Sequence, residues 1–141
     1  MASSTRTVRD VMTRDPFVLE PEDSLMKALE IMRLHGVRRI PIVLAGMLVG
    51  LLAEGDLKRA QPSILSESQD DFNRIMDETP ISRIMIQNPM TIAPDLPLLT
   101  AAETLHTMKF GALPVVEDGK VVGILTDSDL LRTLVEILRA G

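Results

Sequence analysis

The chain has 141 residues, a net charge of −5 at neutral pH, and no Cys, Trp or Tyr. Disulfides are excluded, which favours a reducing compartment, and 45% hydrophobic residues can supply the core of one ordinary domain. The polar N-terminus lacks an apolar signal segment and the apolar runs are too short to cross a membrane, so we expect a soluble, cytoplasmic protein.

The charge and the aromatic content exclude nucleic acid as a partner. An acidic chain repels polyphosphate and offers no basic stripe for it. The only aromatic residues of the Phe, Tyr and Trp type are Phe17, Phe72 and Phe110, too few for a platform on which bases stack. Any ring that binds here must be held by aliphatic side chains and main-chain groups.

An internal repeat organises the chain. When the sequence is shifted by 73 residues, segment 11–60 aligns with 84–133 without a gap, and 15 of 50 positions are identical. The identical pairs include Gly50 with Gly123 and Asp56 with Asp129. We therefore expect two copies of one structural unit.

In the first copy, the turn dipeptide Asp15-Pro16 precedes a short extended stretch, 17–19. Acidic residues at 22 and 23 are expected to cap a helix whose apolar residues recur at helical spacing from Leu25. Two apolar strands, 40–44 and 47–52, follow around a tight hairpin, and a second helix is expected from Asp56. Pro62 should end that helix early.

The second copy repeats this order. It predicts an extended stretch at 90–92, a helix from Leu98, strands at 113–116 and 121–125, and a last helix from Asp127. The polar linker, 61–80, carries apolar residues at the spacing of a short docked helix. Each copy is thus a β-α-β-β-α unit that is too small to bury its sheet alone. We expect an α/β fold in which the two units pack face to face as one module.

Catalytic and metal-binding groups are scarce. His35 and His106 do not occupy equivalent positions and are interpreted as surface or helix-end residues. No nucleophile with a nearby base is evident, and no cluster of ligands indicates a metal site. Glu30 and Glu103 recur, but on the polar side of a helix. We do not expect an enzyme.

The segment in which the last strand meets the last helix is the most informative one. Thr126 and Asp129 stand three residues apart there. N–H groups at a helix start favour an anion such as phosphate, and a fixed carboxylate can accept both hydroxyls of a ribose. The same spacing also fits a capping box, in which the two side chains only satisfy the helix start.

The first copy helps to separate these readings. It keeps the acid, Asp56, but has Ala53 in place of the hydroxyl. A box that only caps the helix would have little reason to keep its acid, so the repeat favours a ligand role. A sensor also needs Thr126 and Asp129 to be accessible to solvent, whereas a scaffold uses them only as caps.

Three runs together resemble paired CBS domains: 36–43, 111–116 and 123–129. The resemblance covers repeats at 8–60 and 81–135, with 61–80 as a linker that contains a short helix, and is similar to a stand-alone prokaryotic pair. It implies a regulatory module that binds an adenosine-containing ligand, such as AMP, ADP, ATP, S-adenosylmethionine or a cyclic dinucleotide, in the cleft between the repeats. No other cofactor is expected, apart from Mg²⁺ as an optional companion of the nucleotide.

The resemblance also implies which residues form the site. Asp129 would hold the ribose and Thr126 the phosphate, with main chain at Ala112, Leu113 and Pro114 around the adenine and Thr91 nearby. Arg132 either pairs with Asp129 or contacts phosphate.

A weaker second site would use the equivalent positions of the first copy. Ala53 cannot donate a hydrogen bond there, and Glu54 repels phosphate. The residues expected in this second site are Val37, Arg38, Arg39, Ile40, Pro41 and Asp56. Arg38 and Arg39 either reach phosphates or form a solvated strand edge.

The last helix predicts self-association. It is apolar over more than half of its circumference, whereas an ordinary surface helix has one apolar stripe. We expect a homodimer that regulates an unidentified protein partner. The linker helix around Phe72 is the alternative cover for this face, and a ligand-free assembly module is the alternative function.

Overall fold

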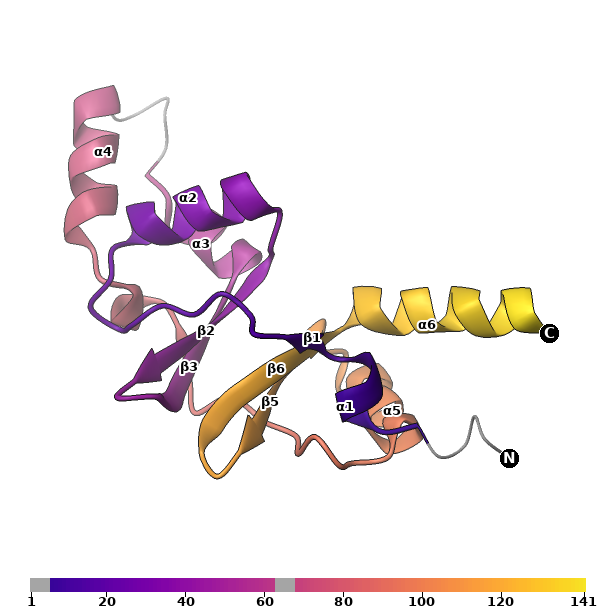
Figure 1. The fold of residues 1–141 in the computed structure, drawn as a ribbon. Helices are drawn as coiled ribbons and strands as arrows, with labels where there is room; N and C mark the ends of the chain where they lie inside the picture. The colour runs from indigo at the N-terminus through magenta and orange to yellow at the C-terminus, as the bar shows by residue number, and fades with distance from the viewer. Residues whose placement is uncertain (1–5, 63–67) are drawn as a thin grey trace. The chain divides into compact units, whose positions relative to one another are not determined.

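The computed structural model describes residues 6–62 and 68–141, which belong to two compact units (Figure 1). The central unit runs from Phe17 to Asn88. The terminal unit combines the chain before Phe17 with Pro89–Gly141. Each unit is a sheet covered by helices, and the predicted mixture of helix and strand is confirmed.

The central unit contains a three-stranded antiparallel sheet in which β3 lies between β2 and β4. Ala45 and Gly46, with φ of 51° and 81°, form the hairpin between β2 and β3, as the sequence predicts. The elements of this unit, in chain order, are α2 (Leu25–His35), β2 (Arg39–Leu44), β3 (Met47–Ala53), α3 (Glu54–Ala60), α4 (Gln69–Glu78), the 3-10 turn η2 (Ile81–Arg83) and β4 (Ile86–Gln87).

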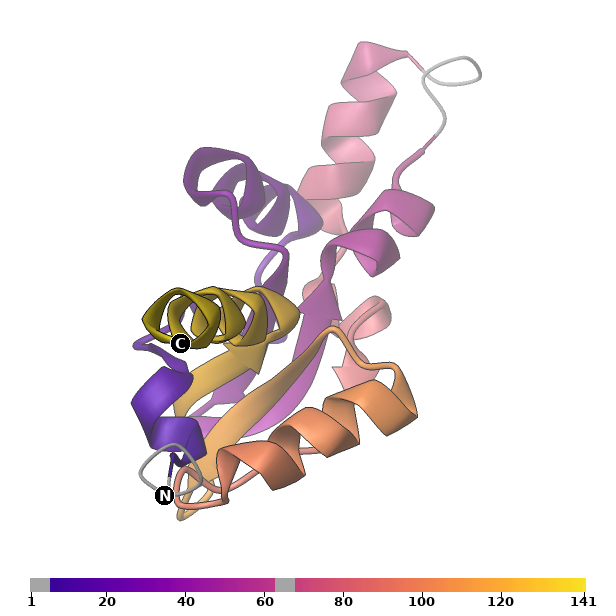
Figure 2. The ribbon, with the colours of Figure 1, turned by 90° about the vertical axis from the view of Figure 1, so that its right-hand side faces the viewer.

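The terminal unit repeats this plan, with β6 between β5 and β1. Helix α5 lies along the strands (Figure 2), and α6 extends from the end of β6 (Figure 1). The elements of this unit, in chain order, are α1 (Val8–Val11), β1 (Thr13–Arg14), α5 (Leu98–Met108), β5 (Ala112–Glu117), β6 (Lys120–Thr126) and α6 (Asp127–Ala140).

Each unit has its own apolar core. Ile40, Ile42 and Leu52 on the strands pack against α2, α3 and α4 in the central unit. Leu113, Val115 and Leu125 pack against α1 and α5 in the terminal unit. These residues alternate along their strands because successive side chains point to opposite faces of a sheet.

Several local predictions are confirmed and three are corrected. The extended stretches at 17–19 and 90–92 are reduced to single parallel bridges, Leu19 with Ile42 and Ile92 with Val115. Ser24, rather than an acid at 22 or 23, caps α2 by accepting from the N–H of Lys27. Helix α3 begins at Glu54, two residues before the predicted start, because Ala53 already has the extended backbone of a cap residue.

The linker helix is present as α4, which packs on α2. Met76 is fully buried there, and Phe72 packs against the same core. Helix α3 ends at Ala60, just before Pro62, as predicted. The apolar face of α4 is therefore used within the central unit.

The opening segment of each repeat belongs to the unit of the other repeat. Strand β1 pairs with β6, more than 100 residues away, and β4, which opens the second repeat, pairs with β3. A Cβ on Gly123 would lie 2.9 Å from the Thr13 carbonyl oxygen, and one on Gly50 would lie 3.1 Å from that of Ile86. The repeated glycines thus allow the exchanged strands to approach closely.

Candidate ligand site at the start of helix α6

The side chain of Asp129 joins the end of β6 to the first turn of α6. Its Oδ2 accepts from the backbone N–H of Thr126 at 3.0 Å, and its own N–H donates to Thr126 Oγ1 at 3.1 Å. These two bonds form the reciprocal capping box that the spacing predicts. The helix start is therefore satisfied by the same two residues that were expected to bind a ligand.

The other carboxylate oxygen, Oδ1, is bound by two further residues. Thr13, on the exchanged strand β1, donates its hydroxyl at 3.0 Å. Arg132 places Nη2 at 3.2 Å from the same oxygen and also donates to the Val11 carbonyl at 3.2 Å. The expected pairing of Arg132 with Asp129 is present, and Thr13 is an additional partner.

The predicted adenine segment lies beside this cluster. Ala112 is the direct partner of Thr126 in the β5–β6 ladder. The carbonyl of Pro114 accepts from the N–H of Ile92 at 3.1 Å, which brings the exposed Thr91 next to the strand. All the residues expected in the main site lie in the terminal unit: Thr91, Ala112, Leu113, Pro114, Thr126, Asp129 and Arg132.

Accessibility differs sharply among these groups. Asp129 is 2% exposed and Thr126 is half-buried, so Asp129 lacks the accessibility that a sensor requires of it. The side chain of Arg132 is 57% exposed. A ligand can therefore reach the Asp129 carboxylate only if one of its present partners moves, and Arg132, the charged partner, has a side chain that is more than half exposed.

The equivalent position in the central unit is simpler. Asp56 accepts from the N–H of Ala53 at 3.4 Å and pairs with Arg59. Ile86 stands where the terminal unit has Thr13, so neither hydroxyl is present. The bond to Ala53 also corrects the argument that a capping acid would be lost with its partner, because Asp56 still holds the helix start by itself.

The remaining residues of the expected second site are also in the central unit. Arg39 pairs with Ala53 in the β2–β3 ladder, and the carbonyl of Arg38 accepts from the N–H of Glu54 at 2.7 Å. Arg38 is exposed, whereas Val37 and Arg39 are partly buried and Ile40 and Pro41 are buried. Among the residues expected in this second site, only the two arginines and Asp56 have charged side chains.

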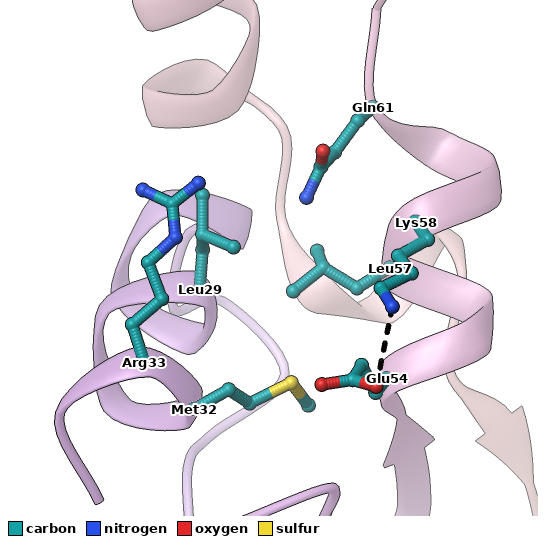
Figure 3. Close-up of a pocket in the computed structure, with 7 residues that line it drawn as sticks. All are labelled: Leu29, Met32, Arg33, Glu54, Leu57, Lys58 and Gln61. Atoms are coloured by element: carbon teal, nitrogen blue, oxygen red, sulfur yellow. Dashed lines mark ion pairs between the residues drawn. The ribbon is translucent and has the colours of Figure 1, made fainter. Parts of the chain in front are cut away.

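A groove between the two helices of each repeat has no counterpart among the predicted sites. In the central unit it has a volume of about 200 Å³ and lies between α2 and α3 (Figure 3). Leu29 and Met32 face Leu57 across it, and Lys58 pairs with Glu54 at its edge. Arg33 and Gln61 complete a largely polar rim.

The terminal unit has the same groove between α5 and α6, with a volume of about 340 Å³. The 73-residue shift places Leu131 at the position of Lys58 and Leu134 at that of Gln61. Leu131 is 62% exposed and Leu134 is 48% exposed. Two of the four polar rim residues, Lys58 and Gln61, are thus replaced by exposed leucines, whereas His106 and Asp127 keep the rim polar at the other two positions.

Two classes of feature are missing from the part of the chain that the structure describes. No three His, Asp or Glu side chains gather there in a way that would hold a metal ion. None of the helices within residues 6–62 and 68–141 combines the length and the apolar character needed to cross a membrane.

The model of the CBS domain family matches the chain twice, over residues 8–63 and 81–136. The chain belongs to the CBS domain family. These two matches cover most of the chain and coincide closely with the internal repeat.

Relatives of similar size support this membership. A CBS domain-containing protein of Dictyostelium discoideum is 32% identical over 93% of this chain and 92% of its own length. The crystal structure of a putative acetoin utilization protein (AcuB) from Vibrio cholerae is 33% identical, with a TM-score of 0.84 and 96% of each chain covered. In contrast, the chain spans only 15% of an A-adding tRNA nucleotidyltransferase of Aquifex aeolicus that is 34% identical to it.

Two similar CBS pairs were solved with ligands. The structure of CBSX2 in complex with AMP is 30% identical, has a TM-score of 0.77 and covers 93% of this chain and 97% of that chain. The CBS domain pair of protein MJ0100 was solved in complex with 5'-methylthioadenosine and S-adenosyl-L-methionine. It is 28% identical, has a TM-score of 0.77, and the match covers 94% of this chain and 98% of that chain. Both pairs therefore bind compounds that contain adenosine.

Proposed function

We propose that this CBS pair is a non-catalytic regulatory module that binds an adenosine nucleotide beside Thr126 and Asp129 and passes the signal to a protein partner. The observation that carries the proposal is the orientation of the Asp129 carboxylate, which Thr126 and Thr13 hold at the end of β6 beside the exposed Arg132. A fixed carboxylate of this kind suits the hydroxyls of a ribose. The ligands of two similar CBS pairs, AMP and S-adenosyl-L-methionine, both carry a ribose.

The neighbouring groups suit the rest of such a ligand. The N–H groups in the first turn of α6, together with Thr126 and the exposed Arg132, favour a phosphate. Main chain at Ala112–Pro114 lies alongside, on the strand that pairs with Thr126. Because the chain has no Trp or Tyr, an adenine ring would contact aliphatic side chains and backbone here.

The central unit is expected to bind the same ligand more weakly. Asp56 has the position of Asp129, but it lacks both hydroxyl partners, whereas the acid at the helix start is common to both repeats as Glu54 and Asp127. Arg38 and Arg39 could compensate in part by contacting phosphate. Unequal binding by the two repeats follows from these substitutions.

The groove of the terminal unit supports a homodimer. Leu138, on the same face of α6 as Leu131 and Leu134, is 68% exposed. Helix α4, the alternative cover, packs its apolar face in the core of the central unit instead. Exposed leucines in a continuous row mark interfaces, and a two-fold axis lets one such patch cover itself.

A ligand-free assembly module is the second candidate function. The reciprocal capping bonds between Asp129 and Thr126, together with the 2% exposure of Asp129, favour this alternative. In that case the box at the start of α6 is only a cap, and the exposed face of α6 carries the function of the chain.

Absorbance of the purified protein distinguishes the two functions. Without Trp, Tyr and Cys, the chain absorbs almost nothing at 280 nm. A sensor that retains its nucleotide should show a peak near 260 nm, and mass spectrometry after denaturation should identify an adenosine compound. A protein without this peak that also shows no heat when titrated with AMP, ADP, ATP and S-adenosylmethionine would support the assembly module.

A further inference from the structure

The carboxylate of Asp129 has few acceptor positions left. A carboxylate offers about four lone-pair positions, two on each oxygen. Thr126 N–H takes one on Oδ2, and Thr13 Oγ1 takes one on Oδ1. Arg132 lies against the second position on Oδ1. Within residues 6–62 and 68–141, only the Thr126 N–H donates to Oδ2, so no donor there takes the second position on that oxygen.

These three partners differ in how firmly they are held. Thr126 is fixed by the β5–β6 ladder, and Thr13 is fixed by its backbone pairing with Ile124 in the β1–β6 ladder. The side chain of Arg132 is more than half exposed, and its second contact is a backbone carbonyl, that of Val11. Arg132 is the exposed member of its pair with the buried Asp129, so its side chain can move into solvent. The groups that replace it must then supply hydrogen bonds to the buried carboxylate.

When Arg132 leaves, one acceptor remains on each oxygen. Two acceptors on adjacent oxygens match two neighbouring hydroxyl groups, each donating to its own oxygen. We infer that the opening segment of the first repeat completes the ligand site of the second: Thr13 orients the Asp129 carboxylate for a vicinal diol, and Arg132 occupies the place of that diol until it binds. This inference rests on the proposed function and assigns Thr13 as a positioning residue.

The central unit provides the contrast. Ile86 has the position of Thr13 and carries no hydroxyl, and Ala53 has the position of Thr126. The Asp56 carboxylate is consequently held by one backbone N–H, at 3.4 Å, and by Arg59. Its orientation is less defined, so selectivity for a diol is expected only in the terminal unit.

The test compares AMP with 2'-deoxyadenosine 5'-monophosphate, which lacks one of the two hydroxyls, by calorimetric titration of the full chain. The parent should prefer AMP. Thr13→Val keeps a β-branched strand residue but removes the hydroxyl, and it should weaken AMP binding about two- to tenfold, the size of one net hydrogen bond. Binding of the deoxy compound should change little, so the preference for AMP falls.

Two variants control this result. Thr13→Ser retains a hydroxyl and should restore the preference, and Ile86→Val changes the equivalent residue of the central unit without effect. If Thr13→Val lowers the affinity for both nucleotides equally, or leaves the preference for AMP unchanged, Thr13 is not a positioning residue. The proposed function would not be affected by that result. A parent that binds neither nucleotide would refute the proposed function and the diol site with it.

Arg132 is tested with adenosine, which has the diol but no phosphate. If Arg132 competes with the diol, Arg132→Met should strengthen adenosine binding about two- to tenfold, the size of one net hydrogen bond that the free protein no longer makes. AMP should gain less, because it also loses a cation near its phosphate. An adenosine affinity that falls in this variant would overturn the assignment of Arg132 as a displaceable occupant.

Discussion

Asp129 and Asp56 occupy equivalent positions in the two repeats, yet their surroundings differ at two side chains. Thr13 and Thr126 provide hydroxyls around Asp129, and Ile86 and Ala53 replace them around Asp56. The spacing of Thr126 and Asp129 was sufficient to predict their mutual bonds, because both lie in one turn. Thr13 was not predictable in the same way, since it is 116 positions away along the chain.

Replacement of each acid by alanine tests the site at the scale of single residues. Hydrogen bonds to a charged group contribute about 1.5–3 kcal/mol, so Asp129→Ala should weaken AMP binding roughly 10- to 150-fold. Asp56→Ala, measured in the same titration, should have a clearly smaller effect. Asp129→Ala also removes half of a helix cap and should lower the free energy of unfolding by about 1 kcal/mol. An Asp129→Ala protein that is less stable but binds AMP normally would show that the residue is only a cap.

At the scale of elements, the repeat predicted most of the helices and strands but not their pairing. Periodic apolar residues and the turns at Ala45-Gly46 and Asp118-Gly119 are local signals, and the hairpins form where these signals occur. The exchange of β1 and β4 between the repeats has no local signal. The methionine and the glycine are each repeated in the sequence, as Met12 and Met85 and as Gly50 and Gly123. In the fold, Met12 contacts Gly123 and Met85 contacts Gly50.

Substitution of glycine tests the exchanged strands. A Cβ at Gly123 would lie 2.5 Å from Met12 Sδ and 2.9 Å from the carbonyl oxygen of Thr13. Gly123→Ala should therefore lower the free energy of unfolding by about 1–3 kcal/mol, measured by denaturant titration. Gly55→Ala is the matched control: its Cβ would meet only Arg59 Nη1 at 3.4 Å, and it should raise stability by up to about 1 kcal/mol. A neutral Gly123→Ala would argue against the close antiparallel pairing of β1 with β6.

At the scale of the whole molecule, each unit has a groove between two of its helices, α2 with α3 and α5 with α6. The sequence indicated only part of this feature. The apolar character of the last helix was readable in the sequence. The sequence did not show that the leucines of this helix line a groove. It also did not show that the other repeat has an equivalent groove, in which Lys58 and Gln61 take the places of Leu131 and Leu134. Because Gln61 and Leu134 are equivalent in the two repeats, a substitution at Gln61 serves as the control for the same substitution at Leu134.

Glutamate at two equivalent positions tests the dimer. Leu134→Glu would bury a charge in an α6 interface and should raise the dimer dissociation constant at least tenfold, which is about 1.4 kcal/mol. Gln61→Glu introduces the same charge in the polar groove of the central unit and should have no such effect. Sedimentation equilibrium should give about 31 kDa for the parent, twice the chain mass of 15.5 kDa. A parent that remains at 15.5 kDa at every concentration would contradict the dimer.

Calorimetric titration of the parent chain with AMP is the most direct test of the central claim, because it gives both the number of sites and their relative affinities. The two hydroxyls around Asp129, and their absence around Asp56, predict one dominant site per chain, or two sites of clearly unequal affinity. Two equal sites would show that Thr13 and Thr126 do not determine binding. A flat titration, repeated with ADP, ATP and S-adenosylmethionine, would contradict the claim that this CBS pair senses an adenosine nucleotide.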